Sequence, residues 1–259
     1  MAVENTEEVV EVKRKFNELT TDNKLKLMSG EPFFLKRIGN IRPLTLREIA
    51  RIGYQKYIEH LNLFLISKKN FIKEEFIDEI DINFFNIMIA FSDEDFDNYI
   101  KKSIKTFFGI DTEVVKENLM IIAKDPEIDF CISSDNFDDI RQVIKWQNGL
   151  DDEKVLDDEV KYKNERAKQI LDKLKKSQAE IQKQKKKEKN DLDFADIISA
   201  IASKSFSLNK LNVFDLTVYQ MYDEFKRLDL IDNYHLATQA MMQGAKNINL
   251  KHWTSKINN

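Results

Sequence analysis

The sequence has little of what several large protein classes require. Its 259 residues include one cysteine, 3 prolines and 6 glycines. The lone cysteine, Cys131, can neither close a disulfide within the chain nor build a zinc site by itself. So few turn residues argue against β-sandwiches, β-barrels and glycine-rich phosphate-binding loops. The chain also lacks any apolar run near the roughly 20 residues that span a bilayer.

The first twenty residues are acidic and lack the basic-then-apolar order of a signal peptide. We therefore expect the protein to stay in the reducing compartment where it is made. The residues that are abundant favour helices: apolar residues make up 42%, charged residues 33%, and there are 18 phenylalanines. This composition can fill a core and suits long solvated helices, so it predicts a mainly α fold.

Apolar spacing divides the chain into four segments. It predicts two helical lobes joined by a charged helix, with a small β-hairpin element in the N-terminal lobe. The segments are a loose N-terminal arm (1–30), an N-terminal helical lobe with short hairpins (31–150), a lysine-rich linker helix (151–190) and a C-terminal helical lobe (191–259).

Local signals predict the elements of the N-terminal lobe. A hairpin is expected within Pro32–Arg42, turning at Gly39-Asn40, and a second one around Asp125-Pro126. Thr45 and Glu48 have the spacing of a capping box, with Leu44 and Ile49 as its hydrophobic staple. Another helix is expected over 71–91. The next should be capped by Ser92, stapled by Phe91 and Phe96, and stopped at Gly109. A further helix should be capped at Ser134 or Asp135 and end at Gly149.

Three helices are expected in the C-terminal lobe. The first has Phe194 and Ile198 on its apolar face, and the second is capped by Asn212 and Asp215. A separate last helix should begin near Asn233 and stop at Gly244.

Catalytic chemistry has no recognisable motif in the sequence. The three histidines, His60, His235 and His252, are far apart and lack the spacing of a zinc helix. Nucleotide-binding and nucleophile-elbow glycine motifs are missing, and the acidic clusters lack the pattern of a calcium loop. The sequence therefore predicts no enzyme, no metal and no cofactor.

Charge is strongly segregated along the chain. Residues 161–190 carry 12 Lys/Arg against 4 Asp/Glu, whereas residues 1–160 carry 22 against 33. The basic segment can serve as a solvated spacer or as a polyanion-binding helix. It contains one aromatic residue, Tyr162, and one arginine, Arg166, whereas nucleic-acid readers use aromatic and guanidinium planes. This scarcity argues against nucleic acid as the partner.

Two stretches carry a family resemblance. They are G-N-I-R-P-L-T-L-R-E-I-A-R-I-G-Y-Q-K-Y at 39–57 and S-L-N-K-L-N-V-F-D-L-T-V-Y-Q-M-Y-D-E-F-K-R-L at 207–228, the latter followed by L-K-H-W at 250–253. The chain resembles the tail assembly chaperones of long-tailed phages and prophages of Gram-positive bacteria.

The resemblance implies a non-enzymatic role in the host cytoplasm. Such chaperones coat the tape-measure protein, help to recruit tail-tube subunits and leave the finished virion. Several systems make a short form and a frameshifted long form that share an N-terminal domain. The run Lys185–Lys187 fits a slippery A-rich tract, which the gene sequence would test. A virion structural or adaptor protein, and a polyanion-binding accessory protein, are the alternative functions.

A chaperone of this kind must display apolar surface on a charged body. Helical spacing offers two aromatic-rich faces and a late tryptophan as candidates, although core packing explains the two faces equally well. Trp253 can either bind a partner or dock the tail onto its own domain, and self-association is a further possibility. The candidate partner-binding residues are Tyr54, Ile58, Leu61, Tyr219, Tyr222, Phe225 and Trp253.

Overall fold

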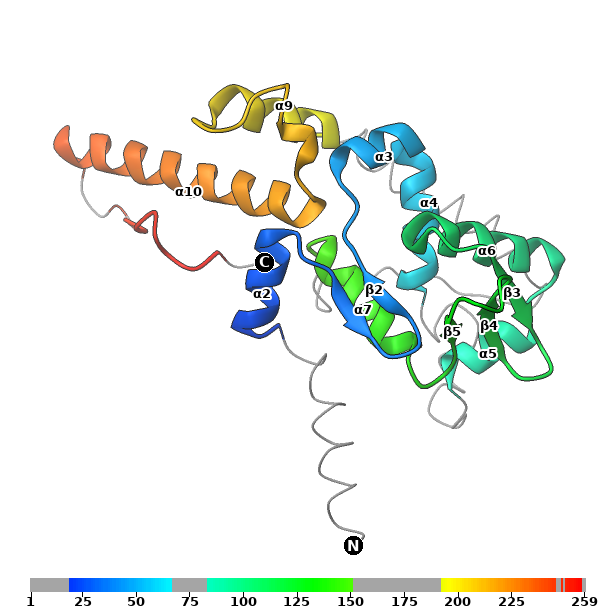
Figure 1. Ribbon diagram of the computed structural model, residues 1–259. Coiled ribbons are helices and arrows are strands. Elements are labelled where there is room, and N and C mark those ends of the chain that lie inside the picture. Colours follow the sequence, from blue (N-terminus) through cyan, green and yellow to red (C-terminus); the bar gives the residue numbers. More distant parts are fainter. Residues whose placement is uncertain (1–18, 67–82, 151–191, 246–247, 249, 258–259) are drawn as a thin grey trace, which may run out of the picture.

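The computed structural model describes residues 19–66, 83–150, 192–245, 248 and 250–257 (Figure 1). Within these ranges the chain is mainly helical, with two small antiparallel sheets. The expected linker helix, 151–190, lies outside the described residues, as does most of the expected arm. None of the described helices is long and apolar enough to cross a membrane.

The elements follow one another in two groups. The N-terminal part comprises α2 (Thr21–Ser29), β1 (Phe33–Leu35), β2 (Gly39–Ile41), α3 (Leu46–Ile52), α4 (Tyr54–Leu65), α5 (Phe84–Ala90), α6 (Glu94–Phe108), β3 (Thr112–Val115), β4 (Met120–Ala123), β5 (Cys131–Ile132) and α7 (Phe137–Gln147). The C-terminal part comprises α9 (Phe194–Lys204), the 3₁₀ turn η4 (Val213–Asp215) and α10 (Val218–Met242).

Helix α2 lies inside the segment expected to be a loose arm, so that prediction is wrong for these residues. The Thr20 side chain accepts a hydrogen bond from the backbone N–H of Asn23, and Gly30 ends the helix in the left-handed conformation. Leu27 is buried, and Gln220 of α10 donates to the carbonyl of Met28 at 2.8 Å. A contact with a distant helix holds this segment in place, and local apolar spacing could not reveal it.

The first hairpin forms, but not with the expected turn. Phe33 pairs with Ile41 and Leu35 with Gly39, so the turn comprises residues 36–38, with Arg37 at a positive φ of 64°. This register buries Phe33, Leu35 and Ile41 together and leaves Phe34 facing solvent. A shift by one residue would reverse these faces, so burial of the apolar set fixes the register.

Helix α3 begins as expected, whereas α4 buries residues beyond the expected face. The capping box of Thr45 and Glu48 is confirmed, and both staple residues, Leu44 and Ile49, are buried. In α4, Tyr57 and Phe64 are buried, while Tyr54 of the expected face is 44% exposed. The helix packs against both α6 and α7, so its buried residues extend beyond the single stripe that was expected.

The rest of the N-terminal part also departs from expectation in its details. Asp93 rather than Ser92 caps α6, and Phe91 is exposed instead of forming a staple, whereas Gly109 is the left-handed stop that was predicted. Asn136, not Ser134 or Asp135, precedes α7. The expected second hairpin is confirmed by the pairing of β4 with β5, and β3 adds an unpredicted strand to it.

One 25-residue helix, α10, replaces the two expected in the C-terminal part. Its N-cap is Thr217, which forms a capping box with Gln220, while Asn212 precedes the 3₁₀ turn and Asp215 is the last residue of that turn. No glycine or proline interrupts residues 218–243. The Asn233 side chain donates to Asp229 at 3.0 Å and so does not cap a new helix.

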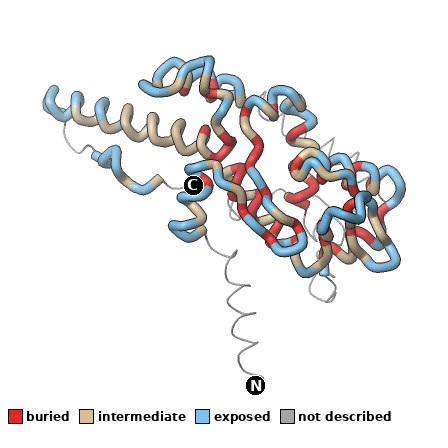
Figure 2. Tube along the Cα trace, viewed as in Figure 1, coloured by how far each residue is buried: buried red, intermediate tan, exposed pale blue. Residues whose placement is uncertain are grey.

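Buried residues from the two parts form one continuous hydrophobic cluster. Ile201, Val213 and Met221 of the C-terminal part are fully buried in it. Figure 2 shows buried segments in both parts of the chain. The two parts of the chain therefore share one core, a point that the sequence had left open.

Candidate partner-binding surface

The two parts meet where two helices begin, and we call this contact the junction. It comprises Thr45, Leu46 and Arg47 on one side and residues 215–217 on the other. The backbone N–H of Leu46 donates to the carbonyl of Leu216 at 2.8 Å, and Thr45 forms a β-bridge with Thr217. Because Thr45 and Thr217 are the N-caps of α3 and α10, the two helices start side by side.

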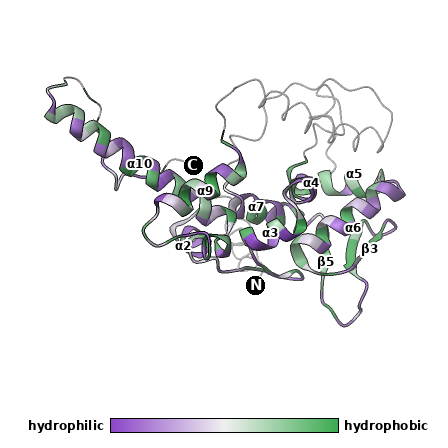
Figure 3. Cartoon of the chain, turned by 90° about the horizontal axis from the view of Figure 1, so that it is seen from above, coloured by the Kyte–Doolittle hydropathy of each residue, from purple (hydrophilic) through white to green (hydrophobic). Residues whose placement is uncertain are grey.

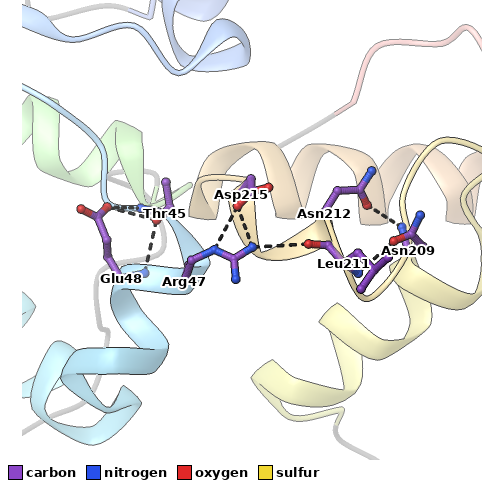
Figure 4. Close-up of polar contacts among 7 residues, drawn as sticks. All are labelled: Thr45, Arg47, Glu48, Asn209, Leu211, Asn212 and Asp215. Carbon is purple, nitrogen blue, oxygen red and sulfur yellow. Dashed lines mark hydrogen bonds and ion pairs between the residues drawn. The ribbon is translucent and has the colours of Figure 1, made fainter.

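Arg47 adds polar contacts across the junction (Figure 4). Its guanidinium donates to Asp215 Oδ1 from Nε at 3.1 Å and from Nη2 at 2.8 Å, and Nη2 also reaches the carbonyl of Leu211 at 3.4 Å. Both charged side chains are well exposed, at 44% and 65%, so the ion pair contributes at most about 1 kcal/mol. Backbone pairing and burial contribute more to the stability of the junction. The role of Arg47 is to position the loop before η4.

A cluster of aromatic rings packs beside the junction. The ring of Tyr54 stacks on that of Phe194 with 4.6 Å between centroids. The Tyr222 ring lies so close to Gly149 that a Cβ added to this glycine would be 3.5 Å from Tyr222 Cδ2. The Tyr57 hydroxyl donates to Asn148 Oδ1. Burial raises the pKa of all three tyrosines, that of Tyr54 to about 12, so the hydroxyls are neutral at physiological pH. These rings hold the C-terminal part against α4 and α7.

Several of the predicted partner-binding residues lie in the interior of the structure. Leu61 is 4% exposed and Tyr219 is 7% exposed, so neither can contact a partner in this packing. Ile58, Tyr222 and Phe225 are half-buried and pack against the core. Their regular apolar spacing reflects packing onto the shared core.

Trp253 belongs to a tail that follows α10 back towards the body (Figure 1). Arg227 Nη1 donates to the carbonyl of Trp253 at 2.6 Å and to that of Ser255 at 3.0 Å. The ring of His252 meets Tyr234 edge-on at 5.1 Å. Trp253 itself is 43% exposed, so the tail is docked mainly by backbone carbonyls and by His252, and the indole remains partly accessible.

Two exposed apolar side chains lie on the loop between α9 and η4. In residues 205–212, here called the apolar loop, Phe206 and Leu211 are highly exposed. The Asn212 side chain accepts from Asn209 N at 2.7 Å and donates to the carbonyl of Ser207 at 3.0 Å, and Asn209 Oδ1 accepts from Leu211 N. Asparagine side chains commonly fix turns, so Asn209 and Asn212 were the signal in the sequence for an ordered loop here.

The far end of α10 is a second exposed apolar region. Leu236 and Met242 are 63% and 84% exposed, and Met241 is also exposed. Figure 3 shows hydrophobic residues continuing to the projecting end of this helix. The signal missed in the sequence is that residues 233–245 contain no Asp, Glu, Lys or Arg.

The capping box next to the junction allows a prediction about pH. The Arg42 guanidinium donates to both carboxylate oxygens of Glu48, at 2.7 and 3.0 Å, and together with Thr45 it lowers the pKa of Glu48 from about 4.5 to about 2. The stability that Glu48 adds is therefore fully present above pH 4.5 and is lost as the pH falls towards 2. We expect Glu48→Gln to cost up to about 1 kcal/mol at pH 7 and clearly less at pH 3, measured by urea unfolding.

The exposed Glu127 provides a control for the general change in charge. Glu127→Gln should show no such difference between the two pH values. An equal loss of stability for Glu48→Gln at both pH values would contradict the assigned role of the carboxylate.

Comparison with known proteins gives one match. Residues 183–258 match the family model described as YomV second domain, which covers less than half of the chain. This family is associated with phages and prophages, so the match supports a phage-related protein. Neither the curated proteins nor the solved structures give a significant match.

Proposed function

We propose that the protein is a non-enzymatic phage tail assembly chaperone that acts in the host cytoplasm. It binds the tape-measure protein and helps to recruit tail-tube subunits. The resemblance of residues 39–57, 207–228 and 250–253 supports this proposal. The phage-associated family match is consistent with it and spans the second stretch and the L-K-H-W sequence that follows it.

The observation that carries the proposal is the apolar loop. Phe206 and Leu211 face solvent on a loop whose backbone is fixed by asparagine side chains. Fixed apolar side chains on a charged protein suit the capture of an apolar helical client, because little ordering entropy is lost when the client binds.

Both stretches that carry the resemblance contribute to this loop. Arg47, in the first stretch, donates to the carbonyl of Leu211, which belongs to the second stretch with Asn209 and Asn212. A shared function at the loop would explain why the resemblance appears in two places so far apart in the chain. We further propose that the lysine-rich segment, 151–190, serves as a charged connection between the two parts and is not itself the client site.

Co-expression with the tape-measure protein of the same phage tests this function. We expect the soluble fraction of the tape-measure protein, measured after centrifugation, to rise severalfold when the full chain is present. The double variant F206S/L211S should lose most of that gain while remaining folded, because both side chains are exposed.

Phe34 supplies the matched control. It is an equally apolar side chain, 69% exposed, on the β1–β2 hairpin. Phe34→Ser should solubilise the tape-measure protein as well as the unmodified chain does. If the tape-measure protein is no more soluble with this chain than without it, the chaperone function is wrong, and the presence of the chain in purified virions would favour a structural role.

A further inference from the structure

Helix α10 extends well past the helix that covers it. At 1.5 Å per residue its 25 residues measure about 37 Å. Helix α9 accompanies only its first part: Ser205 donates to Glu224 at 2.9 Å, and Lys204, the last residue of α9, pairs with Asp232. The remaining turns project from the body (Figures 1 and 3).

The side of α10 that faces α9 continues beyond the end of α9. Met221, Phe225 and Leu228 lie on this side, and all three belong to the core or pack against it. Residues three, four and seven apart share a side of a helix. The same spacing leads to an exposed set that we call the distal stripe: His235, Leu236, Gln239, Met242 and Gln243.

The docked tail lies on a different side of α10. It contacts Arg227 and Tyr234, which are seven residues apart and share one side. Gln239 is five residues beyond Tyr234, which places it about 140° around the helix. Within the described part of the chain, the distal stripe is therefore left open by both α9 and the tail.

The distal stripe has the wrong composition for a face that remains in water. Solvated helical faces usually carry charge, and 33% of this chain is charged, yet residues 233–245 carry none. Leu236 and Met242 project from the stripe among neutral polar side chains. This combination is typical of a surface that is covered in the assembled state.

We propose that the distal stripe pairs with the distal stripe of a second copy, antiparallel, across a two-fold axis at Gln239. In this arrangement Leu236 of each copy meets Met242 of the other, because the two residues lie three positions on either side of Gln239. Gln239 lies against its own counterpart, where the two amides can exchange hydrogen bonds.

The absence of charge favours a second copy over a charged partner. Near a two-fold axis a residue faces its own counterpart, so any charge there would meet a like charge. A partner selected by charge would instead need opposite charges on the stripe, which has none. The paired surface is small, so we expect a dimer that dissociates on dilution.

Sedimentation velocity of the full chain over a wide concentration range tests the pairing. We expect the unmodified chain to move from monomer to dimer as its concentration rises. Gln239→Glu and Gln239→Lys should each raise the dissociation constant at least tenfold, because like charges then meet at the axis. An equimolar mixture of the two variants should regain dimer, now as a mixed pair.

Asn98, exposed on α6 at the opposite end of the molecule, gives the matched control (Figure 1). Asn98→Glu and Asn98→Lys should dimerise as the unmodified chain does. A chain that stays monomeric at every concentration overturns the proposal, as do Gln239 variants that dimerise normally on their own. A monomeric chain whose tape-measure binding is lost in Gln239→Glu would assign the stripe to that client instead. The chaperone function is tested independently of this pairing, by the effect of F206S/L211S in the apolar loop on the solubility of the tape-measure protein.

Discussion

Tyr219→Ala is expected to lower the free energy of unfolding by about 3–5 kcal/mol. The ring lies in the first turn of α10, is 7% exposed and belongs to the cluster that both parts of the chain share. Truncation removes most of its buried area and leaves a cavity in the place where the two parts are packed together. Urea unfolding followed by circular dichroism measures the loss.

Leu61→Ala on α4 should behave similarly, with a loss of about 2–5 kcal/mol, since its side chain is also fully packed. Trp253→Ala is the comparison, because its ring is 43% exposed and should cost less than about 1 kcal/mol. If Tyr219→Ala were as stable as the unmodified chain but could not bind a partner, Tyr219 would belong to the binding surface after all.

A chain ended after Leu150 is expected to lose its cooperative thermal transition or to precipitate. Leu46 of the junction and Ile49, three residues further along α3, are each 1% exposed. Because α3 packs on η4, we expect both to lose part of their cover when the C-terminal part is removed. The N–H of Leu46 also loses its acceptor, the carbonyl of Leu216. Exposing several buried apolar side chains at 1.5–3 kcal/mol each removes much of the 5–15 kcal/mol that stabilises a typical domain.

The matched control ends at Gly244 and so removes only the tail. It should melt within a few degrees of the full chain, since the tail is held by a few exposed or half-buried contacts. Differential scanning calorimetry and soluble yield distinguish the two truncations. A chain of 150 residues that melts cooperatively at the temperature of the full chain would show that the N-terminal part is an independent domain.

This second prediction bears on the short form implied by the family resemblance. A short form that ends near the lysine-rich segment would leave the junction side of α3 uncovered. Such a form would need another chain, a copy of itself or a client, to cover Leu46 and Ile49.

Some features of the fold were readable from a few neighbouring residues. The capping box of Thr45 and Glu48 and the left-handed stop at Gly109 depend only on local side-chain and backbone chemistry. The turn near Asp125-Pro126 is equally local. The predicted break before Asn233 failed because asparagine can cap a helix but can equally lie within one, and only the surrounding contacts decide between these positions.

The candidate surface was much less predictable. Apolar spacing identified Leu61 and Tyr219 correctly as members of helical faces but could not say whether those faces were open. The exposed Phe206 and Leu211 lie in a short loop without periodicity, so they gave no helical signal. Whether an apolar side chain is buried depends on the segments that arrive from elsewhere in the chain.

By itself, then, the sequence determined the mainly helical class, several helix ends and the separation of charge along the chain, because each follows from composition or from residues within one turn of each other. Tertiary structure decided that the two parts share one core and which apolar residues remain exposed. The physical reason is that the deciding contacts are long-range. Arg47 meets Asp215 across 168 residues of chain, and Thr45 pairs with Thr217 beside it.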